Sequence, residues 1–262
     1  MNATTPRDDR ELLNKVPEVT LWFWIIKVMA TTVGETAADL LSTRLGLGLG
    51  VTSLIMAAVF VVALVLQVRA RRYVPALYWF TVVAISVVGT LVSDNLVDGY
   101  GVSLVTTSVA FAIVLGLVFF AWWRSEGTLS IHSVVTRRRE LFYWAAILFT
   151  FAMGTSVGDL LAETLDLGYG QAALVFGAMI GAVALAHYVF RLDAILAFWI
   201  AYILTRPLGA SMGDLFAKPA IAGGFGLGTV TTSLIFLGVI LGLVAYLTLS
   251  RADRLDPVPA PR

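Results

Sequence analysis

Four aspartates recur at the same place in four similar segments of the chain. Asp39, Asp94, Asp159 and Asp214 each stand fifteen residues after a tryptophan, near the end of an apolar run. A carboxylate inside an apolar span is costly in lipid, and such groups usually face a bundle interior or an aqueous cavity. Four of them at one offset therefore predict a cluster of acids that could bind a cation or exchange protons. A structural role, with each aspartate hydrogen-bonded at a loop, is the alternative.

A fifth acid lies one helical turn before the first of these aspartates. Glu35 precedes Asp39 by four residues, a spacing that puts both side chains on one face of a helix. The corresponding residues in the other segments are Thr90, Thr155 and Ala210. We expect Glu35 and the two threonines to extend an oxygen-lined wall inward from the aspartates.

The residue types limit which ion such a wall could hold. The chain has no cysteine and only two histidines, His132 and His187, to which we assign no role. Carboxylate and hydroxyl oxygens suit Mg²⁺, Mn²⁺ or Ca²⁺ better than Cu⁺ or Zn²⁺. We expect Mn²⁺ or Mg²⁺ as a bound ion and no other cofactor. The candidate metal ligands are Asp39, Asp94, Asp159, Asp214 and Glu35, and the candidate pathway residues are Thr90, Thr155 and Arg206.

Two cations lie within apolar runs. Lys27 follows Trp24 by three residues, so we expect its ammonium to reach the nearby membrane surface. Arg206 lies near the middle of its run, beside Pro207, which predicts a kink. If the first and fourth segments meet in a closed ring, Arg206 could pair with Glu35. That pair could fix the ring or act as a gate, and both interpretations stay open.

The elements that position these residues are membrane-spanning helices. Hydrophobic residues make up 59% of the 262 residues, charged residues make up 13%, and the mean hydropathy is +0.88. These values exclude an ordinary soluble domain and predict a polytopic membrane protein. We expect eight spans: Val19–Leu41, Val51–Val68, Ala76–Val97, Val102–Trp123, Leu141–Leu161, Ala172–Phe190, Ala194–Phe216 and Leu227–Leu249.

The spans form four copies of one two-helix unit. In each copy a glycine follows the tryptophan by ten residues, which gives the sets Trp24/Gly34/Asp39, Trp79/Gly89/Asp94, Trp144/Gly154/Asp159 and Trp199/Gly209/Asp214. The first and third tryptophans, like the second and fourth, are 120 residues apart, so a four-span half was itself duplicated. The fold prediction is an all-α bundle of eight transmembrane helices, in four parallel repeats with pseudo-symmetry about the membrane normal. We expect the tryptophans to anchor at the membrane interface and the glycines to let helices pack closely.

Arginine and lysine predict the orientation. Most of them follow the even-numbered spans or lie near the two ends of the chain, which places both termini in the cytoplasm. We divide the chain into a cytoplasmic tail (1–18), a first half (19–124), a cytoplasmic linker (125–140), a second half (141–250) and a second cytoplasmic tail (251–262).

The fourfold tryptophan–glycine–aspartate spacing resembles a family of uncharacterised bacterial multi-pass membrane proteins built of four tandem two-span repeats, each with a tryptophan. The resemblance covers about residues 17–250. It implies the same architecture in a bacterial inner membrane.

For function, we expect a transporter that exports or exchanges a divalent cation resembling Mn²⁺. A proton-coupled transporter of a small solute and a membrane scaffold without transport activity are the alternatives. An enzyme is not expected, because the chain lacks hydrolase and metalloprotease motifs. The expected partners are the lipid bilayer and a small cation or proton, without nucleic acid, and the sequence leaves homo-oligomerisation open.

Overall fold

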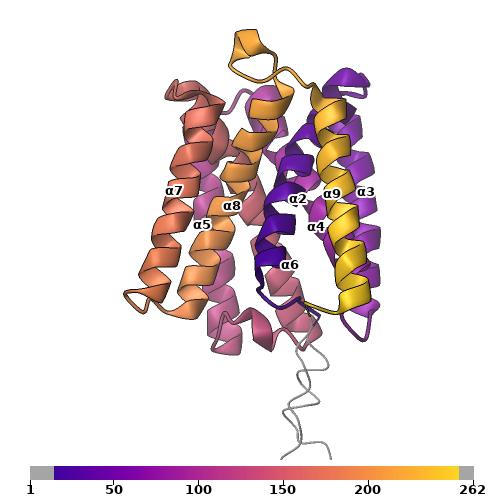
Figure 1. Ribbon diagram of the computed structural model, residues 1–262, viewed down its shortest axis with the longest axis vertical. Coiled ribbons are helices and arrows are strands. Elements are labelled where there is room, and N and C mark those ends of the chain that lie inside the picture. Colours follow the sequence, from indigo (N-terminus) through magenta and orange to yellow (C-terminus); the bar gives the residue numbers. More distant parts are fainter. Residues whose placement is uncertain (1–14, 254–262) are drawn as a thin grey trace, which may run out of the picture.

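The computed structural model describes residues 15–253, and these residues form helices and loops without a strand. Eight long helices run side by side (Figure 1). They are α2 (Leu21–Asp39), α3 (Gly48–Arg69), α4 (Pro75–Asp94), α5 (Leu104–Glu126), α6 (Arg137–Asp159), α7 (Gly168–Tyr188), α8 (Ala194–Ala217) and α9 (Thr229–Ser250). The predicted all-α bundle of eight helices is confirmed. Residues 1–14 and 254–262, which include most of both predicted tails, lie outside the described residues.

Local sequence signals explain where several helices begin. The side chains of Thr20, Ser103, Thr136 and Asp193 each accept a hydrogen bond from a backbone N–H in the first turn of α2, α5, α6 and α8. Such N-caps satisfy donors that the helix itself leaves unpaired. In the first three repeats the first helix continues past its aspartate into a wider π-helical turn, at Leu40–Arg44, Asn95–Gly99 and Leu160–Thr164.

The first helices of the four repeats form a closed inner ring. Each of α2, α4, α6 and α8 packs against the next one, and α8 packs back on α2. The glycines make this close packing possible in a cyclic pattern. Cβ atoms added at Gly34, Gly89, Gly154 and Gly209 would overlap Ser86, Phe151, Arg206 and Thr31, each from the following repeat. The four glycines therefore lie where neighbouring inner helices approach most closely.

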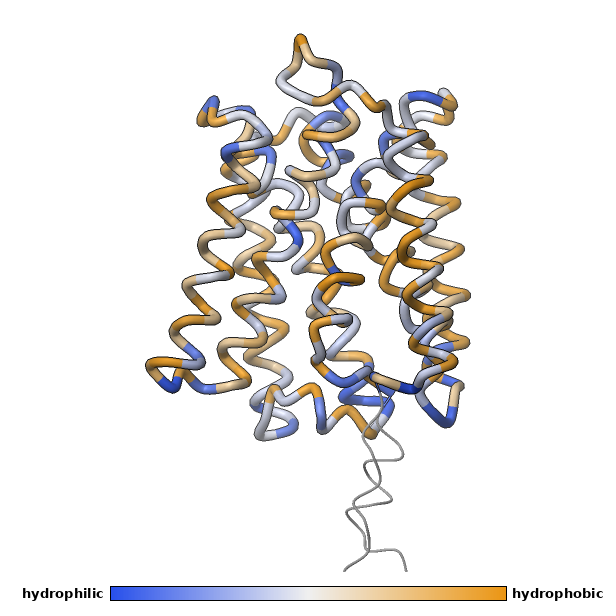
Figure 2. The backbone as a smooth tube through the Cα atoms, viewed as in Figure 1, coloured by the Kyte–Doolittle hydropathy of each residue, from blue (hydrophilic) through white to orange (hydrophobic). Residues whose placement is uncertain are grey.

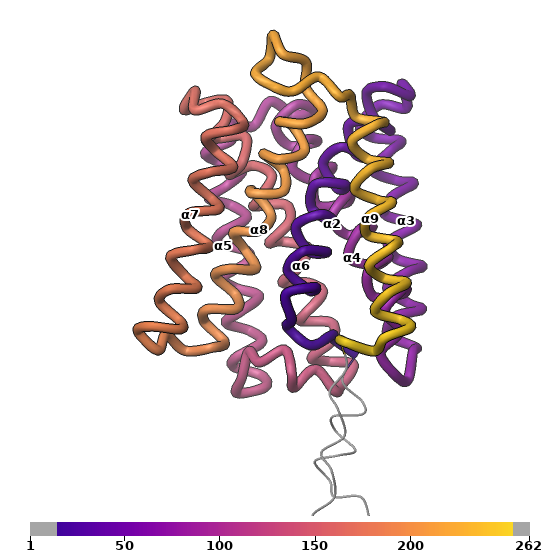
Figure 3. Tube along the Cα trace, viewed as in Figure 1, coloured from indigo at the N-terminus to yellow at the C-terminus, as the bar shows by residue number. Residues whose placement is uncertain are grey.

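The second helices form an outer layer. Each packs mainly on the first helix of the following repeat: α3 on α4, α5 on α6, α7 on α8, and α9 on α2 (Figure 3). In the most apolar 18-residue stretch of the inner helix α4, 67% of the residues are buried, against 17% in that of the outer helix α3. The outer helices therefore shield the inner ring from the surroundings.

The outer surface fits a bilayer. In Figure 2 the middle of the bundle is predominantly hydrophobic, and hydrophilic residues concentrate at its two ends. Within residues 15–253, seven helices are long and apolar enough to cross a membrane. The eighth, α2, is less apolar because it carries Lys27, Glu35 and several threonines, but it completes the inner ring beside α4 and α8. The chain is a multi-pass membrane protein.

The two ends of the bundle differ. Both ends of the described chain meet at one end, where the backbone N–H of Glu18 donates to the carbonyl of Asp253 at 3.1 Å. We call this end the termini side. The opposite end carries the turns that join the two helices of each repeat, and we call it the turn side (Figure 1).

Candidate functional site

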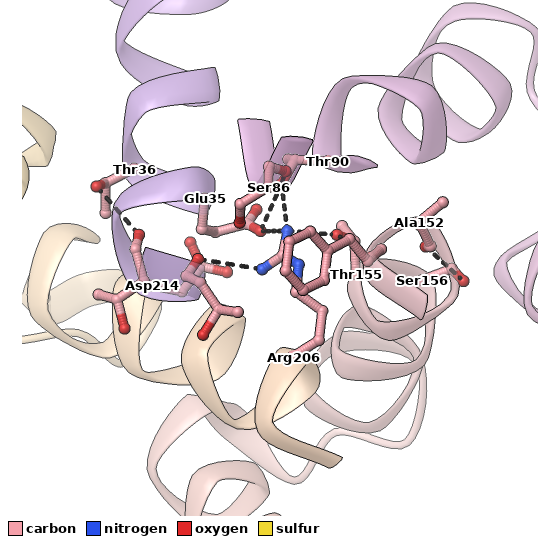
Figure 4. Close-up of polar contacts among 12 residues, drawn as sticks. Glu35, Thr36, Ser86, Thr90, Ala152, Thr155, Ser156, Arg206 and Asp214 are labelled. Carbon is pink, nitrogen blue, oxygen red and sulfur yellow. Dashed lines mark hydrogen bonds and ion pairs between the residues drawn. The ribbon is translucent and has the colours of Figure 1, made fainter. Parts of the chain in front are cut away.

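The guanidinium group of Arg206 lies in the middle of the inner ring and is completely buried. Its Nη2 donates to the Oε2 of Glu35 at 3.0 Å and to the hydroxyl of Thr155 at 2.6 Å, and also to the hydroxyl of Thr90. Its Nη1 donates to the carbonyl of Thr31 at 3.2 Å. One side chain from α8 thus joins all four inner helices, as Figure 4 shows.

The repeat explains this convergence. Glu35, Thr90 and Thr155 all follow the repeated glycine directly, so pseudo-symmetry turns the three toward one axis. The fourth copy has Ala210 at that position, and its polar contribution comes from Arg206, one turn earlier. The structure therefore brings together the predicted pathway residues and the predicted Glu35–Arg206 ion pair.

The sequence of α8 fits the arginine into the ring. The side chain of Arg206 lies against Gly154 of α6, where any larger residue would overlap its Cβ and Cγ atoms. Pro207 follows inside the helix. Because proline has no N–H, it cannot donate to the carbonyl four residues earlier, and this weakens the helix at the depth of the ion pair.

Lys27 does not reach the membrane surface, contrary to the expectation from sequence. Its side chain is fully buried, with Nζ 4.1 Å from the ring centre of Phe151 and 4.2 Å from that of Tyr202. The rings of Phe151 and Tyr202 are parallel, at an interplanar angle of 2°. Within residues 15–253 no hydrogen-bond acceptor meets this Nζ. Cation–π attraction to the two rings is its main compensation.

The four aspartates lie one turn further toward the turn side. Each aspartate follows by four residues the position directly after the repeated glycine, which is Glu35, Thr90, Thr155 or Ala210. Residues four apart share one helix face, so each aspartate lies on the axial face of its helix. Asp214 is 5% exposed, and the other three are half-buried. They do not form the tight cluster expected from sequence. Among the described residues, no three acidic or histidine side chains lie close enough together to hold a metal ion.

A lysine that the sequence analysis missed joins two of these aspartates. Nζ of Lys218 lies 3.8 Å from Asp39 and 3.7 Å from Asp214. Burial by itself would lower the pKa of Lys218, but the carboxylates of Asp214 and Asp39 outweigh it and raise that pKa above its ordinary value. The spacing of four residues between Asp214 and Lys218 was a signal that could have identified this pair.

Asp94 and Asp159 lie on the other half of the ring and form no ion pair within the described part of the chain. Neither they nor Asp39 caps the π-helical turn that follows it with a side-chain hydrogen bond. The alternative expectation was that the aspartates hold the loops through hydrogen bonds. These three side chains do not do so at the turns that follow them.

Aromatic side chains fill the inner ring toward the termini side. The residue before each tryptophan packs on the tryptophan of the next repeat, in the pairs Phe23–Trp79, Tyr78–Trp144, Tyr143–Trp199 and Phe198–Trp24, with ring centres 5.6, 5.7, 6.3 and 5.7 Å apart. Trp79, Trp144 and Trp199 are at most 4% exposed, so the expectation of interfacial anchors is wrong for these three. They close the ring because the aromatic residue beside each one turns inward.

Hydroxyl groups outside the axis connect inner and outer helices. Thr36 of α2 bonds Ser233 of α9 at 2.7 Å, and Ser108 of α5 donates to Ser156 of α6 at 3.1 Å. These two related positions therefore each join an inner helix to an outer one.

No curated protein matches the chain, and no solved structure does. One family matches four times, over residues 22–73, 77–128, 142–193 and 197–253, and these matches follow the four structural repeats. The chain belongs to this family, which is described as a repeat of unknown function (DUF347).

Proposed function

We propose that the chain is a proton-coupled transporter of a small solute, which crosses the membrane along the axis of the inner ring. The observation that carries this proposal is the buried Glu35–Arg206 pair at the axis, one helical turn from four aspartates. Ionisable residues inside a membrane bundle are expensive to keep and usually mark an ion or substrate pathway.

The Glu35–Arg206 pair acts as the gate in this proposal. Among the described residues, Glu35 is the only carboxylate bonded to Arg206. When Glu35 takes up a proton, its attraction for the guanidinium falls, and Arg206 can leave the axis. Pro207 gives α8 a weak point beside the arginine. The half-buried aspartates pass protons between the turn side and Glu35.

The aromatic layer forms a second barrier in this proposal. The hydroxyls of Tyr78 on α4 and Tyr143 on α6 lie 2.5 Å apart, and the rings of Phe23 and Phe198 pack beside each other. With the termini in the cytoplasm of a bacterial cell, as the distribution of arginine indicates, this layer seals the cytoplasmic side. The half-buried aspartates then face the outside.

Proton flux in proteoliposomes tests the proposal. The purified chain is reconstituted with a pH-sensitive dye inside, and small carboxylates, amines, sugars and divalent cations are added in turn. We expect at least one class of solute to drive proton movement in the parent protein and none to do so in Glu35→Gln. Glu126→Gln is the matched control, because it removes a carboxylate at the termini side. If Glu35→Gln transports as well as the parent, the gate is wrong.

A divalent cation is the second candidate substrate, because Asp94 and Asp159 offer carboxylates without an ion-pair partner among the described residues. Calorimetric titration with Mn²⁺, Mg²⁺ and Ca²⁺ tests it, beside a variant with all four aspartates changed to asparagine. Saturable binding that the variant loses would favour a cation as the substrate. An absence of binding in a folded protein would refute it.

A further inference from the structure

A groove of about 440 Å³ opens on the termini side, away from the ion pair. Its floor is the first half of α8, and its walls are the last turns of α7 and the start of α2, with the α5–α6 loop at its end. Trp24 and Phe198, one of the aromatic pairs that close the inner ring, line its inner side. The groove therefore ends against the barrier of the proposed pathway.

The first half of the chain shows what fills the same place elsewhere in the fold. A shift of 120 residues relates the two halves, so α3, α4 and Trp144 correspond to α7, α8 and Trp24. There the ammonium of Lys15 lies 2.7 Å from the carboxylate of Glu140 and donates to the carbonyl of Val68 at 2.9 Å. Glu140 is 3% exposed, and its carboxylate lies beside the side chains of Gln67 and Trp144. A buried ion pair thus occupies the first-half site.

The second half has lost these side chains. Glu140 corresponds to Thr20, and Lys15 corresponds to Val135. Three further exchanges remove volume where the groove opens, since Phe60, Leu64 and Thr81 correspond to Ile180, Ala184 and Ala201. At the corresponding place the first half carries larger side chains at these three positions, and a carboxylate beside a tryptophan.

The lining of the groove indicates which kind of ligand could take the place of the first-half side chains. None of its residues is aspartate, glutamate, lysine or arginine, and its polar side chains include two imidazoles, His132 and His187. The Nδ1 of His187 lies 2.8 Å from the carbonyl of Leu192, so this nitrogen donates and Nε2 is the one that can meet a ligand. His132 already lies 3.8 Å from the carboxylate of Glu18, so His187 is the imidazole left to meet a ligand. An imidazole that carries hydrogen on both ring nitrogens donates to a carboxylate through Nε2.

We propose that this groove binds an aromatic weak acid, with its ring against the faces of Trp24 and Phe198 that line the groove and its carboxylate at His187. The acid replaces the carboxylate that Glu140 supplies in the first half. This inference deepens the proposed function, because it names the substrate class and a loading site next to the aromatic barrier. A cavity of this volume, mostly apolar with a few polar groups, is typical of small-molecule sites.

Binding to the detergent-solubilised full chain tests the groove without requiring transport. Benzoate and salicylate are titrated calorimetrically, beside the neutral benzamide and the cationic benzylamine. We expect saturable binding of the two acids, at least tenfold tighter than that of benzylamine. The double variant Ala184→Leu/Ala201→Thr should weaken acid binding at least tenfold. It introduces the residues that the first half already carries at these positions, so the fold should accept it. Ala178→Leu adds a similar volume on the exposed face of α7 and should bind normally.

Other variants and results separate the alternatives. His187→Gln, which copies Gln67, should reduce the preference for benzoate over benzamide at least fivefold. Equal binding of all three charge types would overturn the recognition of an acid. A co-purified phospholipid that excess benzoate does not displace would identify a lipid site and refute the proposal. Acid binding in a protein that moves no protons in liposomes would retain the groove and reject the proposed transport.

Discussion

Removing the charge of Arg206 should destabilise the protein more than any hydrogen-bond deletion around it. Arg206→Met keeps most of the side-chain volume but leaves the 7%-exposed carboxylate of Glu35 without its partner. Breaking a buried pair from one side typically costs about 3–5 kcal/mol in unfolding free energy. Hydrogen bonds between transmembrane helices contribute only about 0.6 kcal/mol on average. The charge should therefore dominate, and Thr90→Val or Thr155→Val should cost about 1 kcal/mol or less.

A double-mutant cycle measures this directly. Glu35→Gln alone leaves the guanidinium buried without a counter-charge, so it should also be costly. The double variant Glu35→Gln/Arg206→Met removes both charges. Its loss of unfolding free energy should therefore be smaller than the sum of the two single losses, by about 2 kcal/mol or more. Unfolding is followed by circular dichroism during titration of mixed micelles with denaturing detergent. A cost below about 1 kcal/mol for Arg206→Met, with a coupling energy near zero, would refute the assignment of the pair.

Three further predictions rest on other contacts. Gly154→Ala would push a Cβ into Arg206 and should lower stability by about 1–3 kcal/mol, whereas Gly177→Ala on α7 meets nothing within 4 Å and should be silent in the same detergent titration. Lys27→Met removes a buried ammonium without an acceptor among the described residues, so the melting temperature should stay unchanged or rise, and a clear fall would show that the charge is needed. Lys218→Met should lower stability slightly. Because the folded-state pKa of Lys218 is raised, its contribution to the unfolding free energy should persist up to the ordinary lysine pKa of about 10.4. That contribution should disappear only as the pH rises through the raised value. A stability difference between parent and variant that vanished below pH 9 would contradict the pairing with Asp39 and Asp214.

Much of the fold could be predicted because its signals are periodic and local. The positions of Trp24, Gly34 and Asp39 recur at one spacing, and apolar runs of membrane length surround them. Parallel repeats must then place equivalent residues around one axis, which is why Glu35, Thr90 and Thr155 could be grouped in advance. The pairing of Glu35 with Arg206 followed only on the assumption that the ring closes.

The site was predicted less well, because local sequence does not state which way a side chain turns. Lys27 could lie at the surface or inside, and only the parallel rings of Phe151 and Tyr202 hold it inside. The tryptophans were expected to anchor the helices at the membrane interface. Instead, the aromatic residue before each one packs on the tryptophan of the next repeat inside the ring. Repetition of the aspartates predicted a cluster, whereas no three acidic side chains of the described residues lie close enough together to hold one ion.

The sequence by itself determined the membrane class, the number of helices and the fourfold repeat, because hydrophobicity and spacing are properties of the chain and need no partner. Only the tertiary structure decided that the ring closes on Arg206, that Lys218 joins two aspartates, and that the two halves differ in a groove. Each of these depends on contacts between residues far apart in the chain. Which side chain fills a shared space at the axis or between two helices is decided when the helices pack.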